Sequence, residues 1–180
     1  RPHSVLHHHL VPGAMDAYAR SRINFTDVRD DPRVKPTLFM PPRKASMGFP
    51  PGVPIDKPAV KRVIDEAHRR GMFVYGTVSC AVEVARFPDV LRTYQELLAL
   101  GVDGLWLSFD DTGAGGDAPE IIRRVLELGG RHGMSGRKIA ITPPSGDYQE
   151  IDRPFNRTCA RVPGMEQAQW FFTRVPCRDD

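Results

Sequence analysis

Five short apolar runs recur along the chain, each bounded by glycine or proline and separated from the next by a longer amphipathic stretch. Runs of this length and content are typical of strands buried in a parallel sheet. They predict strands over residues 36–40, 72–78, 104–109, 138–142 and 169–173.

The stretches between these runs place apolar side chains at helical spacing. They predict helices over residues 14–23, 57–70, 88–100 and 118–131. Asp56 is placed to cap the second of these helices, and Gly71 is placed to end it. Asp117 and Glu120 form a D-x-x-E start signal for the last one.

Strands that alternate with helices of this length predict an α/β fold with a parallel sheet. We expect one domain, in which residues 1–34 supply an N-terminal helix and a connecting segment and residues 35–180 supply the strands and helices of the sheet. Such a sheet can be open and doubly wound, or it can belong to a (β/α)8 barrel, which has eight units and about 250 residues. The pattern alone leaves both architectures open.

Composition and charge exclude several function classes. The chain of 180 residues is 41% hydrophobic and 26% charged, with a net charge of +3 and interspersed signs, so no basic stripe for a nucleic acid is present. No apolar run approaches the roughly 20 residues that cross a bilayer. Cys80, Cys159 and Cys177 lack close spacing, which indicates buried structural thiols rather than disulfides or zinc ligands. The sequence leaves open the compartment, the oligomeric state and the origin of the His7 to His9 run.

An acidic pair, Asp110 and Asp111, follows the third predicted strand. Because side chains alternate along a strand, two faces are predicted there: Trp106, Ser108 and Asp110 on one, and Leu105, Leu107 and Phe109 on the other. The apolar set suits packing against helices, so the set with Ser108 and Asp110 should face a barrel interior or a crevice. Both carboxylates then emerge at the carboxyl end of a parallel strand, where α/β proteins place their active sites.

Two neighbouring carboxylates repel when both are charged, which raises one pKa and divides the pair into an acid and an ionised partner. Glycoside cleavage needs that division. The alternative is a pair that caps a turn or binds a cation such as magnesium. Gly113, Gly115 and Gly116 do not follow a phosphate-loop spacing, and we expect them to form a flexible wall beside a pocket.

The residues around this pair resemble glycoside hydrolase family 84, the β-N-acetylglucosaminidase and O-GlcNAcase family. The most specific match is PDVLRTYQELLALGVDGLWLSFDD, in which a helix and a Leu-Gly-Val link precede a strand that ends in Phe-Asp-Asp. Four weaker matches keep the family's order and spacing: LFMPPRK at 38–44, GTVSC at 76–80, ITPPSGDY at 141–148 and QWFFTR at 169–174.

The resemblance implies a retaining, substrate-assisted reaction on a glycan or glycoprotein that carries N-acetylglucosamine, without a metal or organic cofactor. Asp110 would orient and polarise the 2-acetamido nitrogen. Asp111 would protonate the glycosidic oxygen and then deprotonate water. Tyr148 would line the acetamido pocket, and Arg43 or Lys44 stands near the family's sugar-contacting lysine.

The chain also departs from the family. Phe172 replaces a tryptophan and Arg174 a glycine, the family's first strand is not visible, and its Asn and Asp that hold the sugar hydroxyls fall beyond Asp180. We therefore expect a barrel that is incomplete at both ends. Three alternatives stay open: an inactive sugar-binding or scaffolding module of the same fold, a family 20 hexosaminidase, whose Asp-Glu pair is absent here, and an open-sheet protein that binds magnesium for phosphoryl chemistry.

Overall fold

The computed structural model describes residues 14–20, 24–28, 48–109, 117–144 and 153–170. The helices are α1 (Ala14–Arg20), α2 (Lys57–His68), α3 (Phe87–Leu100), α4 (Ala118–Arg131) and α5 (Pro154–Cys159). The strands are β1 (Phe25–Asp27), β2 (Phe73–Ser79), β3 (Gly104–Ser108), β4 (Ile139–Thr142) and β5 (Gln169–Trp170). Short 3-10 turns lie at η4 (Val84–Arg86), η5 (Gly136–Lys138) and η6 (Met165–Gln167).

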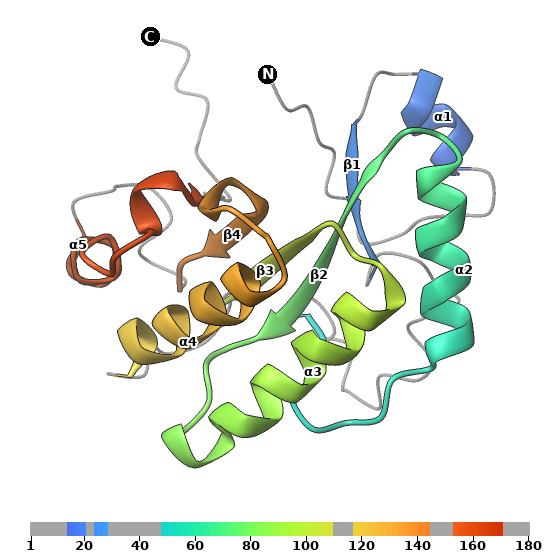
Figure 1. Ribbon diagram of the computed structural model, residues 1–180. Helices are drawn as coiled ribbons and strands as arrows, with labels where there is room; N and C mark the ends of the chain where they lie inside the picture. The colour runs from blue at the N-terminus through green and yellow to red at the C-terminus, as the bar shows by residue number, and fades with distance from the viewer. Residues whose placement is uncertain (1–13, 21–23, 29–47, 110–116, 145–152, 171–180) are drawn as a thin grey trace, which may run out of the picture.

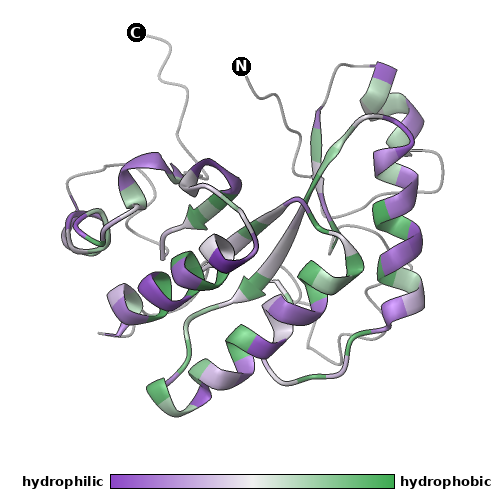
Figure 2. Cartoon of the chain, in the orientation of Figure 1, coloured by the Kyte–Doolittle hydropathy of each residue, from purple (hydrophilic) through white to green (hydrophobic). Residues whose placement is uncertain are grey.

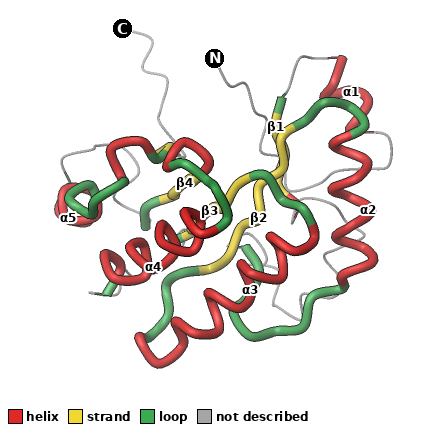
Figure 3. Tube along the Cα trace, viewed as in Figure 1, coloured by secondary structure: helices red, strands yellow, loops and turns green. Residues whose placement is uncertain are grey.

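The five strands form one curled sheet in the order β1-β2-β3-β4-β5, and every pair in it is parallel (Figures 1 and 3). The predicted α/β class with a parallel sheet is therefore confirmed. The described strands are consistent with an open parallel sheet, whereas an eight-stranded barrel is not shown. The predicted division between residues 34 and 35 lies outside the described part of the chain.

One face of the sheet packs against the helices. Strand residues such as Val74, Leu105 and Ile141 belong to the same buried cluster as apolar residues of all five described helices. The hydrophobic residues of α2, α3 and α4 lie along one side of each helix and the hydrophilic ones along the other (Figure 2). The opposite face, which we call the inner face, has its own cluster, which among the described residues contains strand residues alone: Phe25, Phe73, Tyr75, Trp106 and Ala140.

The ends of the helices test three predicted signals. Asp56 caps α2, since its Oδ1 accepts a hydrogen bond of 3.0 Å from the Ala59 backbone nitrogen. Gly71 has a φ of +70° just beyond the end of α2 and so takes a conformation that favours glycine. The start signal at α4 is confirmed in position, because Asp117 is the N-cap residue, but its side chain makes no capping bond. Glu120 instead contacts the arginines of the next turn.

The strand predicted over residues 36–40 lies outside the described residues, and the described first strand, β1, was not predicted. β1 pairs only with the amino-terminal half of β2, up to Tyr75. The other half of that edge pairs with Phe49, whose backbone bonds Thr77 O at 2.8 Å and Ser79 N at 3.1 Å. The approach is close because Gly48 has no side chain: a Cβ there would lie 2.8 Å from Thr77 O.

Candidate active site

All four residues that the sequence assigns to the site, Asp110, Asp111, Tyr148 and Arg43, lie outside the described residues. Lys44, Phe172, Arg174 and the glycines at 113, 115 and 116 also lie outside them. Their roles therefore stay predictions. The structure does describe the strand that leads to Asp110, both of its neighbours and the inner face of the sheet beneath that edge.

The backbone is held on both sides of β3 up to the residue before Asp110. The Cys80 nitrogen donates to the Ser108 carbonyl at 2.9 Å, and the Phe109 nitrogen donates to the Thr142 carbonyl at 3.0 Å. The Phe109 ring packs on the helix side against Phe155, with ring centroids 5.1 Å apart. The predicted alternation is confirmed for residues 105–109: Leu105, Leu107 and Phe109 belong to the cluster that packs against the helices, and Trp106 belongs to the inner face.

Aromatic rings fill the amino-terminal half of the inner face. Tyr75 contacts Phe25 and Trp106 edge to face, with centroids 5.5 and 6.0 Å apart, and burial raises the pKa of its hydroxyl to about 12. Gly104 leaves room for these rings, because a Cβ there would lie 2.7 Å from the Tyr75 ring and 2.6 Å from Lys138 O. This half of the face is a packed floor.

The carboxyl-terminal half of the inner face carries hydroxyl groups. Ser79, Ser108 and Thr142 stand side by side in the register of β2, β3 and β4, and all three are buried. Thr142 Oγ1 accepts a hydrogen bond of 2.8 Å from the Trp106 indole. Ser108 Oγ is shielded from solvent and has no hydrogen-bond partner among the residues that the structure describes. A polar row thus lies under the edge from which Asp110 continues.

A buried carboxylate stands at the end of β1. Asp27 is 0% exposed, and its Oδ2 accepts a hydrogen bond of 2.5 Å from the Thr77 hydroxyl, which is also 0% exposed. Asp27 shares the inner face with Phe25, two residues earlier. The sequence analysis missed this acid. The available signal was an aspartate directly after an aromatic and a β-branched residue.

The thiol of Cys80, near this edge, is buried. Cys80 lies 3.6 Å from the Tyr94 hydroxyl, and burial raises the pKa of the thiol to about 12, far from the values of reactive cysteines. Tyr94 donates to the Trp106 carbonyl at 2.7 Å and supports β3 from the helix side. Cys80 and Cys159 are both buried, as predicted for structural thiols, and Cys177 lies outside the described residues.

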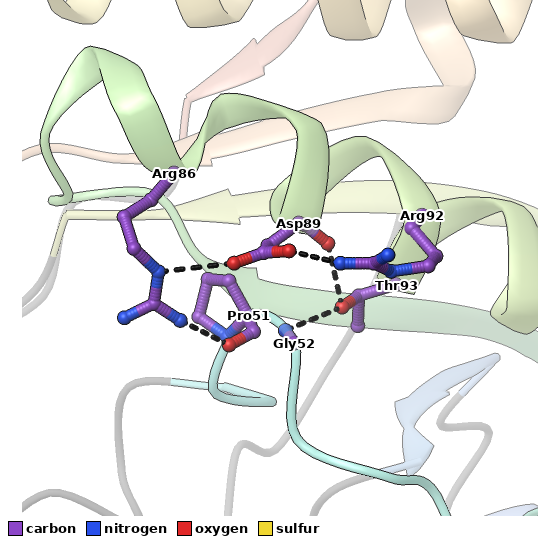
Figure 4. Close-up of polar contacts among 6 residues, drawn as sticks. All are labelled: Pro51, Gly52, Arg86, Asp89, Arg92 and Thr93. Carbon is purple, nitrogen blue, oxygen red and sulfur yellow. Dashed lines mark hydrogen bonds and ion pairs between the residues drawn. The ribbon is translucent and has the colours of Figure 1, made fainter.

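A second polar cluster joins α3 to the segment before α2 (Figure 4). Asp89 pairs with Arg86 at 3.1 Å and with Arg92, while Arg86 donates to the Pro51 carbonyl at 2.5 Å. Thr93 Oγ1 accepts from the Gly52 nitrogen at 3.3 Å and donates to the Asp89 carbonyl. A pocket of about 230 Å³ adjoins this cluster. The charged side chains that line the pocket are all paired, Lys57 with Glu96 and Arg92 with Asp89. These contacts indicate a structural role, in which they hold α3 against the segment before α2.

Within the described ranges, no group of three or more metal-ligating side chains comes together, and none of the described helices is long and apolar enough to span a membrane. The described part of this region consists of a packed aromatic floor, a row of buried hydroxyls and a strand, β3, that is hydrogen-bonded on both sides up to Phe109. The sequence matches no known protein family and no curated protein.

Proposed function

We propose that the protein is a glycoside hydrolase that removes terminal β-linked N-acetylglucosamine by a retaining, substrate-assisted mechanism. The observation that carries this proposal is the end of β3, where hydrogen bonds to both neighbouring strands hold the backbone up to Phe109. The acidic pair comes next in the sequence, on the strand end where parallel sheets place their active sites. Continued alternation would turn Asp110 toward the hydroxyl row of the inner face.

The order of the strands supports a barrel as the architecture of the whole domain. Each described strand pairs with the next in sequence, and every described helix packs on one face. Successive right-handed β-α-β units that keep one direction of progression put all helices on one side and curl the sheet toward closure. A doubly wound sheet reverses its order at a switch point. No reversal occurs among the described strands, so we propose that they are consecutive strands of a barrel.

The proposed reaction assigns one task to each carboxylate. The oxygen of the substrate's 2-acetamido group attacks the anomeric carbon while the bond to the leaving oxygen breaks. Asp111 gives its proton to that oxygen, and Asp110 accepts a hydrogen bond from the acetamido nitrogen and so favours the attack. An oxazolinium ion results, whose N–H stays hydrogen-bonded to Asp110. Asp111 then takes a proton from the water that opens it, which restores the acid and gives a product with retained configuration. No metal or organic cofactor takes part in this sequence.

The test is release of 4-methylumbelliferone from its β-N-acetylglucosaminide by wild type, Asp110→Asn and Asp111→Asn, with the β-glucoside as the control substrate. We expect a loss of about 10²–10⁴-fold in kcat for each variant, as for removal of an acid or base catalyst. Asp111→Asn should lose less on substrates with acidic leaving groups, which need little protonation. Equal activity of both variants and wild type would contradict the assignment.

The second candidate is a sugar-binding module of the same fold that has lost catalysis. Phe172 and Arg174, which replace a tryptophan and a glycine of the family, favour it. Binding of an N-acetylglucosamine analogue without hydrolysis would select this candidate.

A further inference from the structure

The buried hydroxyls of the inner face differ in how they are satisfied. The Thr77 hydroxyl donates to Asp27 at 2.5 Å, and Thr142 Oγ1 accepts from Trp106 at 2.8 Å. Ser108 Oγ has no such partner among the described residues, although Ser108 is only 1% exposed. Ser108 therefore differs from Thr77 and Thr142 on the same face, whose hydroxyls are hydrogen-bonded within the fold.

An unpaired buried hydroxyl lowers stability, because the group gives up its hydrogen bonds to water and gains none. Packing on this face does not require a hydroxyl group. Ala140, on the same inner face of the next strand, is fully buried and its side chain has no polar atom. A buried polar group without a hydrogen-bond partner in a native fold needs an explanation, and one explanation is that the group binds a ligand.

The position of Ser108 points to a ligand. It is the last residue of the third of five strands, between Ser79 and Thr142, and the acidic pair follows two positions later. The aromatic floor lies on the amino-terminal side of this row, so a ligand of Ser108 would lie toward the carboxyl end of the described strands. Sugars present amide and hydroxyl groups that pair with a hydroxyl as either donor or acceptor.

We propose that Ser108 is a substrate-binding residue whose hydroxyl pairs with the 2-acetamido group of the bound sugar. This assignment rests on the proposed function. It makes Ser108 a determinant of specificity, because a sugar without the amide would leave the buried hydroxyl unpaired and would gain nothing from it. It also predicts that the unpaired hydroxyl lowers the stability of the free protein, and that this loss is regained when the sugar binds.

The test compares wild type, Ser108→Ala and Thr93→Val. The Thr93 hydroxyl is also largely buried, but it bonds the backbone of Asp89 and Gly52 and so serves the fold. The measurements are the unfolding midpoint without ligand and the dissociation constant of the thiazoline analogue of N-acetylglucosamine, which copies the oxazoline. Ser108→Ala should unfold at the same or a higher temperature than wild type and bind the analogue about 3–10-fold more weakly, as for one lost neutral hydrogen bond. Thr93→Val should unfold at a lower temperature and bind as wild type does.

Two outcomes overturn the assignment and leave the proposed function intact: Ser108→Ala binds the analogue as tightly as wild type, or it loses stability as Thr93→Val does, which would mean that the hydroxyl has a structural partner. If wild type itself does not bind the analogue, the proposed function and the role of Ser108 both fail.

Discussion

The buried pair of Asp27 and Thr77 allows a quantitative test of the inner face. We consider Thr77→Val, which keeps the shape of the side chain and removes the hydroxyl. The hydrogen bond that is lost is short, at 2.5 Å, and both residues are 0% exposed, so no water replaces the hydroxyl without a local rearrangement. Removing one partner of a buried hydrogen bond costs about 1–3 kcal/mol. We expect a loss of about 2 kcal/mol, or about 4–8 °C in the unfolding midpoint of a chain of this size.

The measurement is urea unfolding followed by fluorescence, with Thr93→Val as the matched control. Thr93 is 4% exposed and its hydroxyl bonds two neutral backbone groups, for which about 1 kcal/mol is expected. Thr77→Val should therefore cost about twice as much as the control, with an unchanged denaturant slope. A loss below about 0.5 kcal/mol, the size of an ordinary surface substitution, would refute the reasoning that Asp27 depends on this hydroxyl.

Three further predictions concern other parts of the molecule. The pKa of Glu120 is lowered from 4.5 to about 2 by hydrogen bonds with Arg123 and the adjacent arginine, so its stabilising contribution is present above about pH 4.5 and is lost as the pH falls toward 2. Glu120→Gln should thus unfold slightly below wild type at neutral pH, and this gap should shrink steadily as the pH falls from about 4.5 toward 2; a gap that does not change with pH would contradict this. Cys80, with its thiol pKa raised to about 12 by burial, should resist iodoacetamide in the native protein at pH 8 and react after unfolding, as read by peptide mass mapping; native labelling would argue against it. Gly104→Ala should cost at least about 1–3 kcal/mol in thermal unfolding, since its Cβ would meet Lys138 O at 2.6 Å, whereas Gly130→Ala, with nothing within 4 Å in α4, should raise stability by about 0.5–1 kcal/mol; equal midpoints would overturn the packing argument.

Much of the fold could be predicted from the sequence, because long periodic segments carry a strong signal. The helices α2, α3 and α4 begin and end within two residues of their predicted bounds. The strands β2, β3 and β4 also lie where the apolar runs placed them. Of the fifth predicted strand, Gln169–Trp170 is described and confirmed as a strand.

The first strand shows where the signal fails. β1 has only three residues, and the last of them, Asp27, is a buried carboxylate. A prediction from runs of apolar residues assigns such a short segment with an aspartate to a loop. The hydrogen bond from Thr77 that accommodates this acid joins residues 50 positions apart in sequence, so no local window contains it. The same limit applies to the row of hydroxyls, which exists only through the register of three strands. Of the three residues in this row, only Ser108 could be assigned to the inner face from the sequence, by the alternation of side chains along its own strand.

The central claim is that the substrate's own acetamido group is the nucleophile. The measurement that tests it most directly is kcat/KM of the wild-type protein on 4-methylumbelliferyl β-glucosaminides whose N-acetyl group carries none, one, two or three fluorine atoms. Fluorine withdraws electrons from the attacking carbonyl oxygen, so the account predicts a steep fall in rate with each fluorine and no hydrolysis of the β-glucoside. Rates that stay flat across the series would mean that a protein carboxylate attacks instead. No hydrolysis of any member by the folded protein would contradict the claim altogether.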